Sequence, residues 1–459
     1  MRVYVKIRPR PTRRRREGSL LSEAMKIREL GVRAACTLGA AAIAAVMASA
    51  PATAVPTTDA PPSNGSSTTT TPPFTTPNTD SCPQRTQPPP PVDTSEVPAP
   101  GEPTPSALPV PSPAIGGDRL SGCGVVLPKG APPLPADISA TSWMVSDLDT
   151  GRVLAAKDPH GRYRPASTIK VALAIVALRT LDLDTVVIGT QADADVDGTR
   201  VGIGPGGRYT NRQLMQALIM CSGNDAAHAI ATQLGGDKAA VAKMNDVAKS
   251  LRALDTRAAT PSGLDGPGMS TSAYDLSVLF REAMNIPLFA ELIHTEQVDF
   301  PGYPANPAIP DDKDHPGFPI ANDNQLLYNY EGAIGGKTGF TDDARQTFVA
   351  AAERDGHRLV VTLLKADVRP IRPWEQAARL LDYGFALDAD DRIGKLPEAG
   401  SEAVQPSVPL ASPPPRADGS QAQPDRQPHQ AARVATLIGA PLFVMVVLLW
   451  LRRASRRRR

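Results

Sequence analysis

Proline constrains this chain more than any other residue, because its 48 copies are concentrated in two stretches. Residues 51–136 hold 23 of them and residues 397–430 hold eight, among Thr, Ser, Ala and Gln. Such stretches have too few apolar side chains to offset the conformational entropy that folding costs. We therefore predict Pro-rich linkers over residues 51–136 and 397–433. Residues 137–396 remain as one globular domain, long enough for a substantial core.

The N-terminal region has the three parts of an export signal. Residues 1–16 carry eight Lys and Arg and no acid, and residues 34–48 form an apolar run. Ala48-Ser49-Ala50 then fits the small-residue cleavage pattern. We predict a signal peptide region over residues 1–50, which would export the domain that follows.

Near the other end, residues 434–451 contain no charge and would rise about 27 Å as a helix, enough to cross a bilayer core. Residues 452–459 follow with six Arg, and positive charge favours the cytoplasmic side. We predict a single-pass cell-membrane protein with a cytoplasmic basic tail and an extracytoplasmic domain. The alternative, a buried core helix, would not adjoin a Pro-rich linker and an Arg cluster. Export and anchoring also account for the Arg blocks without a nucleic-acid partner.

Export bears on the cysteines as well. Cys82 and Cys123 flank a Pro-rich stretch, and an oxidising compartment favours a disulfide between them. The alternative is two unrelated thiols. Cys221 lies inside the domain, where we expect a small buried residue rather than a reactive one.

Hydrophobic periodicity predicts mixed α and β structure, with strands at both ends of the domain and helices between them. The predicted strands cover residues 142–147, 153–156, 346–352 and 359–365, and the predicted helices cover residues 167–181, 211–220, 225–234, 238–251, 271–284 and 375–384. The helix over 167–181 is apolar on nearly every side, so we expect it to be buried. Residues 301–319 contain six prolines, which predict an irregular loop.

Ser167 and Lys170 open the apolar helix. A spacing of three places them on one helical face, within reach of each other. A lysine among apolar residues loses solvation, which lowers its pKa and lets the neutral amine act as a base for a serine nucleophile. Backbone N–H groups at a helix N-terminus can also stabilise a developing oxyanion. Taken alone, the pair equally fits a capping serine and a lysine that reaches solvent.

Two further clusters complete a pattern. Ser222-Gly223-Asn224 lies between two predicted helices, where both polar side chains can point the same way. Lys337-Thr338-Gly339 is followed by Phe340, and its glycine lets a strand edge approach a ligand closely. Each cluster alone is a weak signal. In this order they form the Ser-x-x-Lys, Ser-x-Asn and Lys-Thr-Gly set of penicillin-binding proteins and class A β-lactamases.

With these motifs the sequence resembles the serine D-alanyl-D-alanine carboxypeptidases, the low-molecular-mass penicillin-binding proteins, over residues 137–390. Supporting motifs similar to those of the family are Gly206-Gly207-Arg208-Tyr209-Thr210, Asn224-Asp225-Ala226, Thr260-Pro261-Ser262-Gly263-Leu264-Asp265 and Asn324-Gln325-Leu326-Leu327. The resemblance implies an α+β fold of the β-lactamase/transpeptidase type. In that fold an antiparallel sheet flanked by helices and an all-helical lobe hold the active site between them, without a cofactor.

The resemblance also implies the chemistry. Ser167 attacks the carbonyl of the penultimate D-Ala of a peptidoglycan stem pentapeptide and forms an acyl-enzyme, while Lys170 takes its proton. Ser222 relays a proton to the amine of the leaving D-Ala, helped by Lys337, and water then releases the shortened peptide. β-Lactams imitate the D-Ala-D-Ala end and trap Ser167.

The other residues are implied to bind the substrate. Asn224 hydrogen-bonds its amide, and Thr338 with Lys337 attracts its terminal carboxylate. Gly339 belongs to the same strand edge, and the backbone N–H of Phe340 joins that of Ser167 in the oxyanion hole.

Two alternatives remain. A class A-like β-lactamase needs a Glu for deacylation, with an Asn four positions later, in a loop before Lys337. No such pair follows Asn224, since Glu282 has Asn285 only three positions on, within a predicted helix. A non-catalytic penicillin-binding sensor or scaffold would keep the fold, but the intact catalytic set argues against it.

The histidines show no metal-ligand spacing, so we predict no metal. They are His160, His228, His294, His315, His357 and His429.

Overall fold

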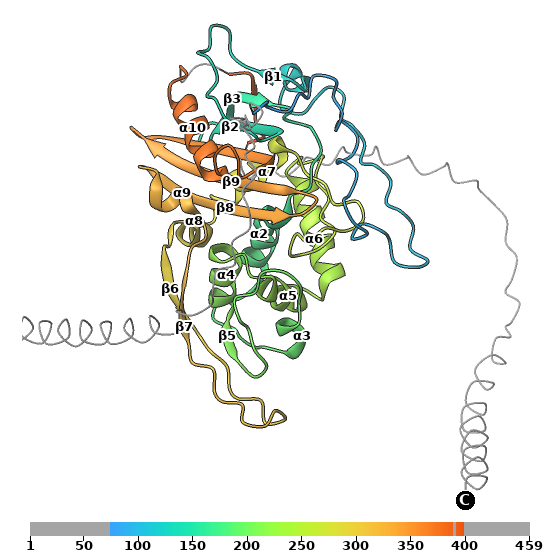
Figure 1. Cartoon of the computed structure of the whole chain (residues 1–459), viewed down its shortest axis with the longest axis vertical. Coiled ribbons are helices and arrows are strands. Elements are labelled where there is room, and N and C mark those ends of the chain that lie inside the picture. The colour runs from blue at the N-terminus through green and yellow to red at the C-terminus, as the bar shows by residue number, and fades with distance from the viewer. Residues whose placement is uncertain (1–73, 389–391, 399–459) are drawn as a thin grey trace, which may run out of the picture. The chain divides into compact units, whose positions relative to one another are not determined.

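The computed structural model describes residues 74–388 and 392–398 (Figure 1). At its centre lies an antiparallel sheet with the strand order β1-β3-β2-β10-β9-β8, and β11 also pairs with β3. The strands are β1 (Val125–Val126), β2 (Ser142–Asp147), β3 (Arg152–Lys157), β8 (Ala333–Thr341), β9 (Arg345–Arg354), β10 (His357–Ala366) and β11 (Gly394–Lys395). Strands from the two ends of the domain are therefore neighbours, because β2 pairs with β10.

Helices cover both faces of this sheet. One group makes up the all-helical lobe and its border with the sheet: η2 (Ala166–Ile169), α2 (Lys170–Thr180), α3 (Gln191–Ala194), α4 (Asn211–Met220), α5 (Asn224–Gln233), α6 (Asp237–Ser250), α7 (Ala273–Ala283) and α8 (Pro287–His294). On the other face, α10 (Pro373–Phe385) packs against β9 and β10, with α9 (Gln325–Asn329) beside it. A two-stranded sheet of β4 (Val186–Ile188) and β5 (Arg208–Thr210) borders the lobe.

The sheet is apolar on both faces, which yields two core clusters. Val349 of β9 and Val360 of β10 pack toward the helical lobe, whereas Phe348 and Val361 pack toward α10. Successive residues of a strand point to opposite faces, so this alternation fixes the register of β9 against β10. The predicted α+β fold is confirmed.

The expected buried helix is α2, whose residues from Lys170 to Ala177 are all buried. It packs against α4, α6 and α7, so no side faces water for most of its length. At the start of α4, Thr210 accepts from the backbone N–H of Gln213, and the Gln213 side chain accepts from that of Thr210. This capping box starts α4 at residue 211, where the sequence predicted the helix to begin.

The structure corrects the predicted N-terminal linker. Residues 74–127, which we call the strap, lie against the domain, although η1 (Asp118–Ser121) and β1 are their only regular elements among the described residues. Cys82 and Cys123 form a disulfide, as predicted. Leu127 and Leu134 also pack against the core cluster that contains residues of α10, so the domain begins before residue 137.

Arg162 explains how a segment with so few apolar side chains stays in place. Its buried guanidinium donates to the backbone carbonyls of Thr86 (2.9 Å), Leu108 (2.6 Å) and Pro109 (2.8 Å), and to the carboxylate of Asp255 (3.2 Å). An arginine offers five N–H donors in a fixed geometry, so one side chain can bind several carbonyls. The composition of the strap does not reveal these contacts.

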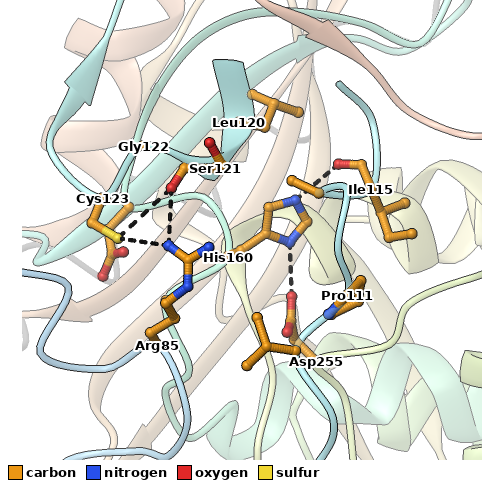
Figure 2. A pocket seen from close by; sticks show the side chains of 13 residues that line it. Arg85, Pro111, Ile115, Leu120, Ser121, Gly122, Cys123, His160 and Asp255 are labelled. Carbon is orange, nitrogen blue, oxygen red and sulfur yellow. Dashed lines mark hydrogen bonds and ion pairs between the residues drawn. The ribbon is translucent and has the colours of Figure 1, made fainter. Parts of the chain in front are cut away.

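His160 provides a second polar attachment (Figure 2). Its Nδ1 lies 2.8 Å from Asp255 Oδ2 and its Nε2 lies 2.9 Å from the carbonyl of Ile115 in the strap. Burial by itself lowers the pKa of His160, but the hydrogen bond and charge of Asp255 outweigh it and raise the pKa above its ordinary value. Both ring nitrogens face oxygen acceptors, an arrangement that favours the doubly protonated ring.

The Pro-rich residues 301–319 are more ordered than expected. Residues 301–317 lie between β6 (Gln297–Phe300) and β7 (Phe318–Ala321), which pair with each other, and residues 318 and 319 belong to β7. Tyr303 and His315 continue this pairing as an isolated bridge, and their rings stack with centroids 4.0 Å apart. The stretch is therefore a hairpin arm rather than an irregular loop.

The predicted signal peptide region, the spanning helix over residues 434–451 and the basic tail lie outside the described residues. Within residues 74–388 and 392–398, no helix is long and apolar enough to cross a membrane.

The disulfide should contribute strongly to stability. Replacing both Cys82 and Cys123 by Ser should lower the free energy of unfolding by about 2–4 kcal/mol, because the bridge joins residues separated by 41 positions. Denaturant unfolding without reductant measures this change. The unbridged Cys221 gives the control, since Cys221→Ser should cost less than about 1 kcal/mol. An equal loss in both variants would contradict a specific role for the bridge.

Candidate active site

Ser167 lies in the 3₁₀ turn η2, directly before α2, and not in the α-helix itself. Ala166 precedes it with a φ of 48°, a left-handed conformation that costs a residue other than glycine about 1–3 kcal/mol. The hydroxyl of Thr347 on β9 donates to the carbonyl of Pro165 at 2.7 Å and so fastens this turn to the sheet. The strained turn places Ser167 at the border between sheet and lobe.

Lys170, the first residue of α2, directs its amine at three oxygens. Nζ lies 2.8 Å from Oγ of Ser167, 2.7 Å from Oδ1 of Asn224 and 2.6 Å from the carbonyl oxygen of Ser262. The predicted contact between Ser167 and Lys170 is therefore present.

The electrostatic surroundings favour the neutral amine. Complete burial, together with the positive charge of Lys337, lowers the pKa of Lys170 well below its ordinary value. The carboxylates of Asp323 and Asp225 act in the opposite direction and do not outweigh these effects. This shift favours the neutral amine that a base requires.

Hydrogen bonding then directs the lone pair of the amine. A neutral amine has two N–H groups and one lone pair. The amide oxygen of Asn224 and the carbonyl of Ser262 can only accept, so they take the two N–H groups. The lone pair is left for the hydroxyl proton of Ser167, which activates this oxygen as a nucleophile.

Ser222 and Asn224 come from the junction between α4 and α5. Ser222 is buried and has a φ of 60°, a second strained residue at the site. Asn224 is the first residue of α5, and its Nδ2 donates to the carbonyl of Asp197 at 2.7 Å. That bond fixes the orientation of the amide and holds its oxygen toward Lys170.

The Lys-Thr-Gly motif lies on β8, an edge strand of the central sheet. Lys337 is fully buried, and its Nζ donates to the carbonyl of Thr338 at 2.9 Å. A Cβ atom at Gly339 would come within 2.9 Å of the backbone nitrogen of Ser167, so only glycine allows the strand to lie this close. Phe340 follows with half of its surface exposed. The structure thus brings Ser167 of η2, Lys170 of α2, Asn224 of α5 and Gly339 of β8 close together. The other predicted site residues, Ser222, Lys337, Thr338 and Phe340, lie beside Asn224 or Gly339 in the chain.

Sequence reasoning missed two contributors. The carbonyl of Ser262 orients Lys170; Ser262 lies in one of the supporting motifs, but the sequence does not indicate this role of its backbone oxygen. Asp323 accepts from the hydroxyl of Thr338 at 2.9 Å. Its place directly before the Asn324-Gln325-Leu326-Leu327 motif is the signal that could have drawn attention to it.

Comparison with known proteins agrees with this geometry. A family model described as D-alanyl-D-alanine carboxypeptidase, peptidase S11, matches residues 129–368. The D-alanyl-D-alanine carboxypeptidase DacB2 of Mycobacterium tuberculosis is 47% identical over 275 residues, which cover 59% of this chain and 90% of that protein. This chain belongs to the D-alanyl-D-alanine carboxypeptidase family, peptidase S11.

Solved structures of the same family are similar to this carboxypeptidase. The crystal structure of a D-alanyl-D-alanine carboxypeptidase from M. tuberculosis H37Rv matches with a TM-score of 0.55 and 46% identity, over 59% of this chain and 100% of that one. The Streptomyces K15 DD-transpeptidase matches with a TM-score of 0.51 and 28% identity, over 56% of this chain and 100% of that one. The predicted family and the transpeptidase-like fold are confirmed.

Family membership identifies the enzyme as a serine peptidase that acts on D-Ala-D-Ala ends. The comparisons favour this activity over the class A-like β-lactamase and over the non-catalytic sensor or scaffold. The family acts on peptidoglycan peptides and binds β-lactams.

The lowered pKa of Lys170 predicts how acylation depends on pH. Acylation by a β-lactam should accelerate as pH rises through that pKa, because deprotonation produces the base, and should reach its plateau well below pH 10.4, the ordinary lysine value. Lys170→Ala should slow acylation by about 10²–10⁴-fold. Stopped-flow acylation measures both effects.

The matched control is Lys243→Ala, an exposed residue of α6, which should leave the acylation profile unchanged. A plateau reached only above pH 10 would mean that Lys170 is charged at neutral pH, contrary to this assignment.

Proposed function

We propose that this enzyme removes the terminal D-Ala from peptidoglycan stem pentapeptides on the outer side of the cell membrane. The contact of Lys170 with Ser167 at 2.8 Å, within a buried site that lowers the pKa of the amine, is the observation that carries the proposal.

The first step is acylation. Lys170 takes the proton of Ser167 as its Oγ attacks the carbonyl carbon of the penultimate D-Ala. The backbone N–H groups of Ser167 and Phe340 stabilise the resulting oxyanion. The close approach of Gly339 to Ser167 supports this pairing of donors, because it brings the β8 backbone to the nucleophile.

Collapse of the tetrahedral intermediate breaks the peptide bond. Ser222 passes a proton to the amine of the leaving D-Ala, with Lys337 beside it, and water then hydrolyses the ester of Ser167. A β-lactam follows the same first step, but its opened ring stays attached and blocks the water.

Substrate binding requires a free carboxylate. We assign its attraction mainly to Lys337. Burial lowers the pKa of this lysine, and the negative charge of a bound carboxylate would favour its ammonium form. The hydroxyl of Thr338 already donates to Asp323, so Thr338 joins the carboxylate only after releasing that bond. Asn224 uses one N–H of its amide on Asp197 and has a second N–H for the substrate carbonyl.

The sequence supports the proposed location. The signal-like residues 1–50 and the uncharged residues 434–451, with Arg after them, support a single-pass protein with its catalytic domain outside. Residues 397–433 would then be the tether between the enzyme and the membrane.

Labelling with a fluorescent penicillin tests the nucleophile. Wild-type protein should form a stable adduct, and Ser167→Ala should form none, since the attacking oxygen is gone. Ser250→Ala, at the end of α6, is the control and should label like the wild type.

Product analysis separates the possible activities. Release of D-Ala from a stem pentapeptide, absent in Ser167→Ala, is the expected result. Rapid turnover of nitrocefin would favour a β-lactamase instead, and penicillin binding without D-Ala release would favour a sensor.

The membrane anchor has its own test. A chain stopped after Arg433 should leave the membrane fraction and appear in the soluble exported fraction, because residues 434–451 are gone. Immunoblotting of the fractions measures the shift, and deletion of residues 454–459 alone should leave the protein in the membrane. A truncated chain that still sediments with membranes would contradict anchoring by residues 434–451.

A further inference from the structure

Three carboxylates from distant parts of the chain meet at the edge of the active site. Glu96 comes from the strap, Asp265 from the loop after Ser262, and Asp343 from the turn between β8 and β9. One carboxylate oxygen of each lies within 4.8 Å of those of the other two. This group is distinct from Ser167 and the other residues assigned to catalysis.

Their negative charge exceeds the positive charge beside them. The cation in contact with the group is Arg164, whose Nε and Nη2 both bind the carboxylate of Glu96. Another of its nitrogens, Nη1, donates to the carbonyl of Pro89 at 2.8 Å, and Nε lies 4.0 Å from Oδ2 of Asp343. One guanidinium therefore faces three carboxylates.

Two of the oxygens are also buried without a hydrogen-bond partner among the described residues. They are Oδ2 of Asp343 and Oδ1 of Asp265. Asp343 is only 6% exposed, and its other oxygen accepts from the backbone N–H of Val92 in the strap. A buried carboxylate oxygen with no donor is costly, so such atoms usually mark a missing partner.

We propose that Glu96, Asp265 and Asp343 bind a divalent cation of the calcium type. The ligands are all carboxylate oxygens, which suit a hard cation such as Ca²⁺ better than the softer zinc. Oxygens that share one Ca²⁺ at about 2.4 Å can lie at most about 4.8 Å apart, and this group meets that limit. The ion would supply the positive charge that Arg164 alone does not.

The position of the site gives the ion a structural role. Asp265 follows Ser262, whose carbonyl orients Lys170, by three residues. Asp343 lies just beyond the end of β8. A bound ion would join the strap, through Glu96, to two walls of the active site.

Calcium titration of the full-length chain in detergent tests the proposal. After removal of divalent ions with EDTA, CaCl₂ at fixed pH should raise the melting temperature of the wild type by about 3 °C or more. Calorimetry should detect one ion per chain with a Kd of about 0.1–1 mM, and MgCl₂ should bind more weakly. Asp343→Asn and Glu96→Gln should each weaken calcium binding at least about tenfold.

Asp342→Asn is the matched control, because Asp342 is exposed in the same turn and outside the group. It should keep the full response to calcium. If Asp343→Asn fails to fold, the calcium response of Glu96→Gln and Asp265→Asn tests the proposal. A wild type that does not respond to calcium but melts at higher temperature as pH falls would show that a proton neutralises the group, and would overturn the proposal. An unchanged response in Glu96→Gln and Asp265→Asn would overturn it too.

Discussion

The active site depends on one constraint: Lys170 must be fully buried and yet keep an amine that can take a proton. Burying an ammonium without a counter-ion is costly, and the second lysine, Lys337, makes the charged form less favourable still. Acceptors at Asn224 and Ser262 satisfy the neutral amine. These groups come from α5, a loop and β8, so sheet and helical lobe must both be in place before the base exists.

Unusual backbone conformations bring the segments around Lys170 close enough for these contacts. Ala166 and Ser222 both have positive φ values, each at a cost of about 1–3 kcal/mol, and each belongs to a catalytic segment. Gly263, with a φ of 88°, lies so near that a Cβ atom would be 2.1 Å from the carbonyl oxygen of Ala166. Gly339 permits the same closeness from β8. The packing of α2 against its neighbours and the sheet maintains these strained conformations, whereas an isolated loop would relax to a conformation of lower energy.

The sequence predicted what local spacing determines. Ser167 and Lys170 are three residues apart, and residues 346–352 and 359–365 are short, mostly apolar runs, so the pair and the two strands could be recognised without a structure. The ordered strap could not be recognised in this way. Its composition shows few apolar side chains, whereas Arg162 holds it through backbone carbonyls, which every residue has. The group of Glu96, Asp265 and Asp343 could not be predicted either, because these residues are far apart in the sequence and only the fold brings them together.

The strap and the nucleophile are coupled through a few consecutive residues. Arg164 binds Glu96 and Pro89 of the strap, Pro165 is bound by Thr347 of β9, and the strained Ala166 leads directly into Ser167. A strained residue persists only where its neighbours hold it on both sides. Lys170 holds the far side by its contact with Ser167, and the strap holds the near side through Arg164. The strap is therefore part of what keeps the catalytic serine in position, although none of its residues takes part in the reaction.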